Sequence, residues 1–143
     1  IMSKLAVVYW SGPGNTEAMA QAVAEGAREA GADVSLFSVS EISAADAAGY
    51  DRLALGCPAM GAEVLEEGEF EPFFEELSPN LSGKPVALFG SYGWGDGQWM
   101  RDWYDRTAAA GAVLQGDEGL ICNEMPDDDG LAACRALGRT LAG

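Results

Sequence analysis

The chain has 143 residues, a length that suits one compact domain. Asp and Glu together number 23, against 8 Lys and Arg, and the formal net charge is −15 at pH 7. A surface this acidic repels nucleic acid and anionic membranes, so the expected partners are proteins with basic docking surfaces.

Histidine is absent, and cysteine occurs three times, at Cys57, Cys122 and Cys134. Histidine is the commonest metal ligand and general base in proteins. Three cysteines without a Cys-x-x-Cys spacing favour neither a zinc site nor a disulfide framework. We therefore expect no metal, and the free thiols favour a reducing compartment.

No apolar run approaches the about 20 residues of a membrane span, and the N-terminus lacks a signal-peptide pattern. We therefore expect a cytoplasmic protein that does not bind a membrane. Ile1 precedes Met2 and is interpreted as a cloning remnant, so the expected single domain covers residues 2–143.

The spacing of apolar residues switches repeatedly between short continuous runs, typical of buried strands, and helical periodicity. In chain order it predicts a strand at Lys4–Trp10, a helix at Thr16–Ala30 followed by Gly31 as a cap, a strand at Asp33–Val39, and one helical turn or more at Ser43–Ala48. A strand at Arg52–Gly56, a helix at Phe70–Leu77, a strand at Pro85–Gly90 and a helix at Gln98–Ala110 follow. The chain then has two strand pieces, at Ala112–Gln115 and Leu120–Asn123, that could form one broken strand, and a last helix at Leu131–Leu141.

Strands that alternate with helices predict an α/β fold with a parallel sheet covered on both faces. Right-handed crossovers then fix how the chain winds. In such folds a ligand binds beyond the carboxyl ends of the strands, so the segments after the first, third and fourth strands are the candidate site.

The segment Ser11-Gly12-Pro13-Gly14-Asn15-Thr16 joins the first strand to the first helix. Its glycines let the backbone pass close to a ligand, and a helix N-terminus attracts anions through unpaired N–H groups. The lysine of a Walker A loop is missing, and Glu17 stands where a dinucleotide-binding loop has its third glycine. The competing interpretation is that the segment only caps the helix and turns the chain.

Two further segments follow strands at the same edge: Gly56-Cys57-Pro58-Ala59-Met60-Gly61-Ala62-Glu63 and Gly90-Ser91-Tyr92-Gly93-Trp94-Gly95-Asp96-Gly97. With the segment 11–16, Glu71-Pro72-Phe73-Phe74 and Asn123-Glu124, they resemble in order and spacing the motifs of the flavodoxins, in particular the short-chain, clostridial-type group. The resemblance implies a three-layer, doubly wound fold with a five-stranded parallel sheet in the order 2-1-3-4-5, for which flavodoxin is the standard example. It also implies a non-covalently bound FMN.

The resemblance implies an FMN site built from three loops, with Met60 and Trp94 covering the two faces of the flavin ring and Glu63 receiving the ring N3–H. The Gly61 peptide would flip on reduction and stabilise the neutral semiquinone, a change that glycine permits at low cost. The full set of expected cofactor-binding residues is Ser11, Gly12, Pro13, Gly14, Asn15, Thr16, Pro58, Ala59, Met60, Gly61, Ala62, Glu63, Ser91, Tyr92, Gly93, Trp94, Gly95 and Asp96.

Pro13 departs from the family pattern, which usually has threonine there. Proline supplies neither a hydroxyl nor a backbone N–H, so a site without cations loses two donors to the phosphate. We expect weaker phosphate binding or a rearranged loop, with FMN still bound. A pre-set loop conformation could offset the loss.

These features predict a monomeric, low-potential electron carrier without catalytic residues, in which the negative charge disfavours the anionic reduced flavin. The alternative is a small flavin-dependent reductase acting on a quinone or a protein. A phospho-acceptor domain is disfavoured, because Ser11-Gly12 replaces the acidic pair that it requires. Cys57 is expected to be buried and inert. Glu63–Glu76 could form either a solvated surface or a docking surface, and Asp127–Asp129 a solvated one.

Overall fold

The computed structural model describes residues 3–116 and 118–143, so the interpretation of Ile1 lies outside the described residues. Its strands and helices are β1 (Lys4–Tyr9), α1 (Asn15–Glu29), β2 (Asp33–Ser38), α2 (Ala44–Ala48), β3 (Arg52–Gly56), α3 (Phe70–Leu77), β4 (Pro85–Tyr92), α4 (Gln98–Ala109), β5 (Val113–Leu114), β6 (Leu120–Asn123) and α5 (Asp128–Ala142). Short 3₁₀ helices lie at Val39–Glu41 and Ser78–Asn80. All the elements predicted from the sequence pattern are present, with shifted ends.

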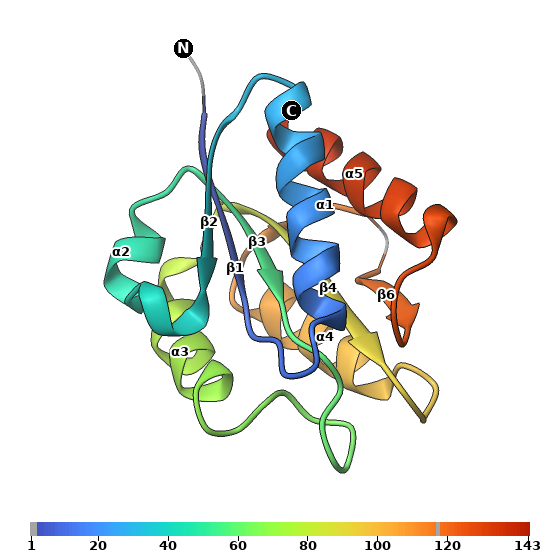
Figure 1. The fold of residues 1–143 in the computed structure, drawn as a ribbon. Coiled ribbons are helices and arrows are strands. Elements are labelled where there is room, and N and C mark those ends of the chain that lie inside the picture. The colour runs from blue at the N-terminus through green and yellow to red at the C-terminus, as the bar shows by residue number, and fades with distance from the viewer. Residues whose placement is uncertain (1–2, 117) are drawn as a thin grey trace.

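The sheet is parallel and runs in the order β2-β1-β3-β4-β5, as the resemblance implied (Figure 1). Both β5 and β6 pair with β4: β5 lies opposite Pro85 and Val86, and β6 lies opposite 89–92. The two short pieces are therefore one interrupted fifth strand, which confirms the broken-strand interpretation.

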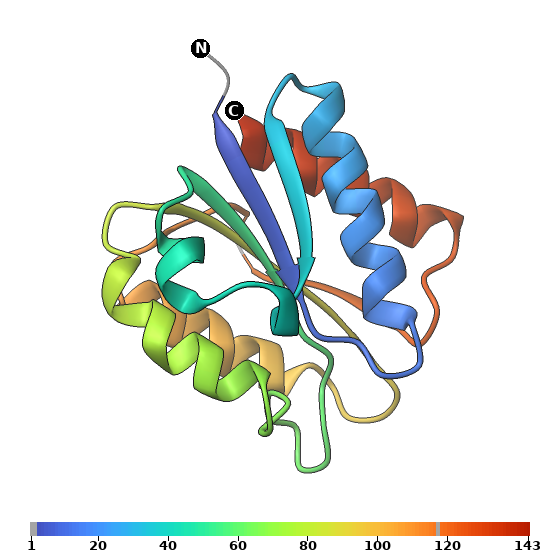
Figure 2. The same ribbon diagram turned by 60° about the vertical axis from the view of Figure 1, so that its left-hand side comes forward.

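Helices cover both faces of the sheet and give three layers (Figures 1 and 2). α1 and α5 pack over Leu5 and Val7, whereas α2, α3 and α4 pack over Ala6 and Val8. Successive side chains of a strand thus enter opposite cores. This two-sided burial explains why the strands are continuous apolar runs in the sequence.

Helix α5 begins at Asp128 instead of the predicted Leu131. The reason is a cap, since the Asp127 carboxylate accepts a hydrogen bond from the Gly130 N–H at 2.8 Å. Asp128 and Asp129 then lie in the first turn, where negative charge favours the helix dipole. Asp127–Asp129 are exposed, as the interpretation as solvated surface expected, and they also form a helix start that the sequence pattern did not predict.

Strand ends also differ from the prediction: β1 stops at Tyr9 instead of Trp10, and β5 covers only Val113–Leu114 of the predicted Ala112–Gln115. Two further ends have a visible cause. β2 stops at Ser38 instead of Val39, because the Ser38 N–H donates to Glu41 Oε1 at 2.7 Å and starts a 3₁₀ turn. β4 continues past Gly90 to Tyr92, because β6 supplies a partner along this extension. The longer β4 carries two of the expected cofactor-binding residues into the sheet edge.

Helices α1 and α5 meet at two glycines. A Cβ added at Gly26 would overlap the backbone carbonyl of Arg135, and one added at Gly138 would overlap the carbonyl of Val23. Any side chain at either position must therefore push the two helix backbones apart.

We expect Gly138→Ala to lower the free energy of unfolding by about 1–3 kcal/mol, because the overlap outweighs the about 1 kcal/mol that alanine gains in helix propensity. Urea unfolding measures the change. Ala132→Leu, at an exposed position of the same helix, is the control and should leave the midpoint nearly unchanged. A Gly138→Ala protein more stable than wild type would show that the helices can separate freely.

Candidate cofactor-binding site

The loops after β1, β3 and β4 converge at the carboxyl edge of the sheet and enclose a cavity of about 280 Å³, here called the cradle. Its lining residues are Trp10, Ser11, Pro13, Asn15, Thr16, Pro58, Ala59, Met60, Ser91, Tyr92, Gly93 and Glu124. All but Trp10 and Glu124 were expected from the sequence. None of these described lining residues is Lys or Arg, so the cradle offers an anion only dipoles and hydrogen-bond donors.

The N-terminus of α1 forms one end of the cradle. Gly14 precedes the helix with φ 105°, a left-handed conformation that suits glycine. The Ser11 Oγ accepts a hydrogen bond from the Glu17 N–H at 3.2 Å, which holds the loop against the first helical turn. The first N–H groups of an α-helix have no partner within it, so this end is suited to an anion.

A buried hydroxyl pair ties this helix end to β4. The Thr16 Oγ1 lies 2.8 Å from the Ser91 Oγ, and the Ser91 N–H donates to Thr16 Oγ1 at 3.3 Å. Thr16 is 1% exposed and Ser91 4%. Both hydroxyls were expected to face the cofactor, but in the structure they also hydrogen-bond to each other and set the spacing of two loops.

The segment after β3 forms a tight hairpin that the sequence pattern did not predict. The Met60 N–H donates to the Val64 carbonyl at 2.9 Å, and the Val64 N–H donates back to the Met60 carbonyl at 3.1 Å. The turn between them needs positive φ at Gly61 (41°) and at Glu63 (55°). A loop held at its base in this way can rotate its tip peptides without disturbing β3.

Glu63 and the loop after β4 form the rim opposite α1. A Cβ at Gly95, whose φ is 87°, would overlap the Glu63 carboxylate, so the two loops touch there. The Glu63 Oε1 is buried and has no hydrogen-bond partner among the described residues. A buried carboxylate oxygen without a donor is costly, so this oxygen is a candidate acceptor for a ligand N–H. Trp94, in contrast, is 67% exposed.

The remaining expected residues do not line the cavity itself. Gly12, Gly14, Gly61, Ala62, Glu63, Trp94, Gly95 and Asp96 lie outside the lining, in the same three loops. Asp96 pairs with Arg101, with 3.0 Å between Oδ1 and Nη2. That ion pair engages the carboxylate of Asp96 and gives Arg101 a local partner on an exposed helix position.

Trp10 and Glu124 line the cradle although they were not among the expected cofactor-binding residues. The Trp10 indole N–H donates to Glu69 Oε1 at 3.2 Å. The Glu124 N–H donates to the Tyr92 carbonyl at 2.7 Å, and Glu124 has φ 55°. Their position directly after β1 and β6 was the available signal, since every strand of a parallel sheet ends at this edge.

Cys57 is fully buried, as expected. Its Sγ accepts a hydrogen bond from the Glu66 N–H at 3.3 Å, and its carbonyl accepts one from the Trp99 indole at 3.1 Å. Burial raises the pKa of the Cys57 thiol to about 12. The thiol is thus a packing group beside the cradle, and its inertness remains a prediction.

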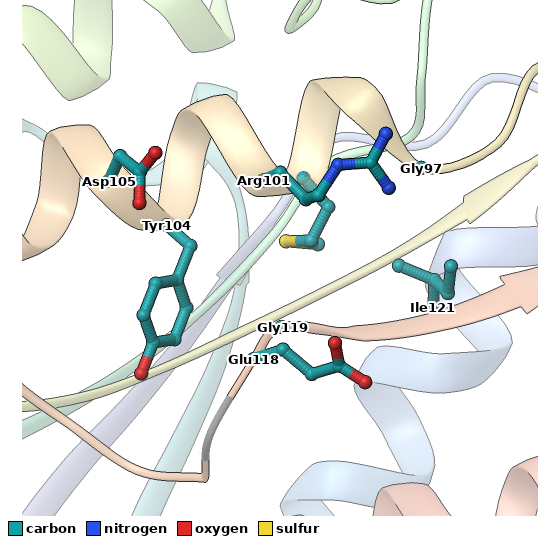
Figure 3. Close-up of a pocket in the computed structure, with 8 residues that line it drawn as sticks. Gly97, Arg101, Tyr104, Asp105, Glu118, Gly119 and Ile121 are labelled. Carbon is teal, nitrogen blue, oxygen red and sulfur yellow. The ribbon is translucent and has the colours of Figure 1, made fainter.

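A second cavity, of about 340 Å³, lies between α4 and β6 (Figure 3). It is lined by Gly97, Met100, Arg101, Tyr104, Asp105, Glu118, Gly119 and Ile121. It is larger than the cradle and reaches Gly97, the N-cap of α4, but only one of the three loops that follow β1, β3 and β4 contributes to it, and Asp96 already engages its guanidinium. The convergence of the three loops, and not volume, therefore selects the cradle as the candidate site.

Within residues 3–116 and 118–143, no helix is both long and apolar enough to cross a bilayer. In the same described part of the chain, no group of three or more His, Cys, Asp and Glu side chains is arranged to hold a metal ion.

Comparison with known proteins gives one consistent family. The family model described as Flavodoxin matches residues 7–138. The flavodoxin of Clostridium beijerinckii is 50% identical over 136 residues, which are 95% of this chain and 97% of that protein. The flavodoxin of Megasphaera elsdenii is 49% identical over 95% of this chain and 96% of its own. A solution structure of the two-electron reduced Megasphaera elsdenii protein superposes with a TM-score of 0.88, at 48% identity, over 96% of this chain and 98% of that one.

Thr16→Val removes the hydroxyl that pairs with Ser91 while keeping the shape of the side chain. We expect the free energy of unfolding to fall by about 1–3 kcal/mol, because the buried Ser91 N–H loses its acceptor and the Ser91 hydroxyl loses its partner. Urea unfolding of the FMN-free protein measures this. Thr16→Ser keeps the hydroxyl and should lose less, and a Thr16→Val protein as stable as wild type would contradict the role assigned to the pair.

Proposed function

Since this chain belongs to the flavodoxin family and is an electron carrier that uses FMN, we propose that the cradle and its rim hold the cofactor. The carrier passes electrons between redox proteins and is not an enzyme. The reductase considered from the sequence is not favoured, because the relatives matched over nearly their whole length are flavodoxins. The observation that carries the proposed site is the buried Glu63 Oε1, which has no hydrogen-bond partner among the described residues.

The phosphate of FMN would lie at the N-terminus of α1. The backbone N–H groups of the first turn and the positive end of the helix dipole supply the attraction that a lysine or arginine supplies elsewhere. The hydroxyls of Ser11 and Thr16 lie in the same lining. Pro13 also lies there but brings no donor, so the backbone of the neighbouring residues must compensate.

The flavin ring would lie between the loops after β3 and β4. Met60 is half-buried in the lining and Trp94 is largely exposed on the rim, so one soft and one aromatic side chain are available for its two faces. Glu63 Oε1 would accept a hydrogen bond from a ring N–H, which satisfies the buried oxygen. When bound, FMN supplies the reversible uptake and release of electrons.

The charge of the protein would set a low potential. The formal net charge of −15 and the cation-free lining both disfavour any added negative charge in the cradle. The same charge favours partners with basic docking surfaces and disfavours self-association, so we infer a monomer. The three free cysteines favour a reducing compartment, so we infer that it works in the cytoplasm.

Some carboxylates of the acidic stretch Glu63–Glu76 form hydrogen bonds within the fold, and others are exposed. The Glu66 carboxylate accepts N–H bonds from Gly68, Glu69 and Phe70. Although burial acts to raise the pKa of Glu66, these three donors outweigh it and hold that pKa below its usual value. Glu71 forms a bidentate ion pair with Arg106, in which Nη1 donates to Oε1 at 2.8 Å and Nη2 donates to Oε2 at 2.7 Å.

Glu67, Glu75 and Glu76 of this stretch are exposed. We infer that these carboxylates, and not those that hold α3 in place, are the ones available to a basic partner. Their contribution would be mainly to the association rate, which rises as the ionic strength falls.

Restoring donors at Pro13 tests the phosphate site. We expect Pro13→Ala, which returns one N–H, to tighten FMN binding, and Pro13→Thr, which returns an N–H and a hydroxyl, to tighten it more, by about tenfold for each donor engaged by the charged phosphate. Titration of FMN-free protein with FMN, followed by flavin fluorescence, gives the Kd. Equal affinities in the three proteins would overturn the phosphate assignment, and a wild-type protein that binds no FMN would overturn the proposed site.

Gly61→Ala tests the hairpin tip. The Cβ position at Gly61 is open, so alanine changes only the cost of its positive φ, by about 1–2 kcal/mol. We expect the midpoint potential of the first one-electron reduction to become more negative by about 40–90 mV, since 59 mV corresponds to a tenfold change. Stepwise reduction followed by visible absorption measures it. Ala62→Gly, at the next position of the tip, is the control, and an unchanged first potential in Gly61→Ala would refute the role of this glycine.

A further inference from the structure

Two of the three cysteines lie close together in the fold, although their spacing in the sequence matches no disulfide motif. Cys122 lies on β6 and Cys134 on α5, and both pack in the core between the sheet and the helices α1 and α5. The Cys122 Sγ packs against Gly130, which lies one helical turn before Cys134 on the same face of α5. Cys57 packs in the opposite core, with α3 and α4.

We propose that Cys122 and Cys134 are a reversible dithiol–disulfide pair that hydrogen peroxide oxidises within one chain. The two side chains share one core, and Cys122 packs one helical turn from Cys134, so closure of the bond needs little movement of the chain. Neither residue belongs to the cradle, and the inference does not depend on where FMN binds.

The surroundings of the two sulfurs assign them different roles. Cys122 is partly exposed, and its Sγ would lie 3.1 Å from a Cβ at Gly130, so it packs against the first turn of α5. A helix N-terminus favours a thiolate. The hydrogen bond from Cys134 lowers the pKa of Cys122, against the opposing effects of burial and of the Asp127 carboxylate. Cys122 is therefore the nucleophile.

Cys134 is fully buried, and its hydrogen bond to Cys122, together with burial, raises the pKa of its thiol. Cys134 therefore stays protonated until a sulfenic acid has formed on Cys122. This makes Cys134 the resolving thiol, protected from direct attack by an oxidant in solution.

The reaction balances in two steps. The Cys122 thiolate attacks one oxygen of hydrogen peroxide, the O–O bond breaks, and a sulfenic acid and hydroxide form. The Cys134 sulfur then attacks the Cys122 sulfur, the S–O bond breaks, and the proton of Cys134 and the departing hydroxide become water. In sum, two thiols and one peroxide give one disulfide and two waters, with two electrons passed from sulfur to oxygen.

The pair also lies next to the edge of the cradle. Cys122 pairs with Ser91 in the β4–β6 register, and the side chain of Asn123 donates to the carbonyls of Tyr92 and Gly93 at 3.2 and 3.4 Å. A bond between Cys122 and Cys134 would anchor this stretch of β6 to α5. Oxidation would thus stiffen the strand that supports the loop after β4.

The test uses the full chain loaded with FMN. The native protein is treated with hydrogen peroxide and the excess is removed. The protein is then unfolded, and its thiols are counted with a chromogenic disulfide reagent. We expect two of the three thiols to disappear, the mass of the chain to fall by two hydrogen atoms, and one peptide pair to be linked through Cys122 and Cys134. Dithiothreitol should restore all three thiols, and the oxidised protein should unfold at a higher urea concentration than the reduced one.

Single-cysteine variants provide the controls. Cys57→Ser should still lose two thiols, whereas Cys122→Ser and Cys134→Ser should form no intrachain disulfide. If a variant does not fold, the mass and the linked peptide of the wild type decide alone. Three thiols left after treatment, a link that involves Cys57, or a disulfide between two chains would each overturn the proposal.

Discussion

The parallel register of β1, β3 and β4 is the constraint on which the candidate site depends. It places Tyr9 opposite Gly56, and Gly56 opposite Phe89, so the loops after the three strands begin side by side at one edge of the sheet. The fit is tight, because a Cβ at Gly56 would overlap the Phe89 ring. Segments 11–16, 57–63 and 91–96 converge because these strands are aligned, and the two cores pack against the strands from either side.

The distribution of basic residues is the second organising feature. The ion pairs Arg135–Glu25 and Arg139–Glu29 join α5 to α1, and Arg106–Glu71 joins α4 to α3. In the described part of the chain, these arginines therefore connect helices on the outside of the sheet. Arg101 pairs with Asp96 in the loop after β4, and no Lys or Arg stands among the described residues that line the cradle. A chain with so few cations can still hold an anion there, because a helix end needs none.

Much of this arrangement follows from local sequence. Continuous apolar runs predict two-sided burial, and helical spacing predicts α3 at Phe70–Leu77 without error. The glycine-rich segments after three strands identify most of the cradle, because a parallel sheet can deliver them only to one edge. The start of α5 was placed too late because a single side chain, Asp127, decides it.

What the sequence could not predict depends on contacts between distant segments. The hairpin at Met60–Val64 has no apolar alternation, and Glu124 joins the lining only because β6 pairs with β4. The contact of Cys122 with Cys134 likewise requires the docking of α5 onto the sheet edge. The Thr16–Ser91 bond spans 75 positions, a distance over which no periodicity argument extends.

The interruption of the fifth strand has a consequence for how this fold can change. The chain leaves the sheet after Leu114 and returns at Leu120, and each piece has its own pairing with β4. Extra residues inserted between them would shift neither register, and the entropy of closing a longer loop rises only slowly with its length. The gap between β5 and β6 is thus a point where the chain can lengthen while the three loops of the cradle keep their positions.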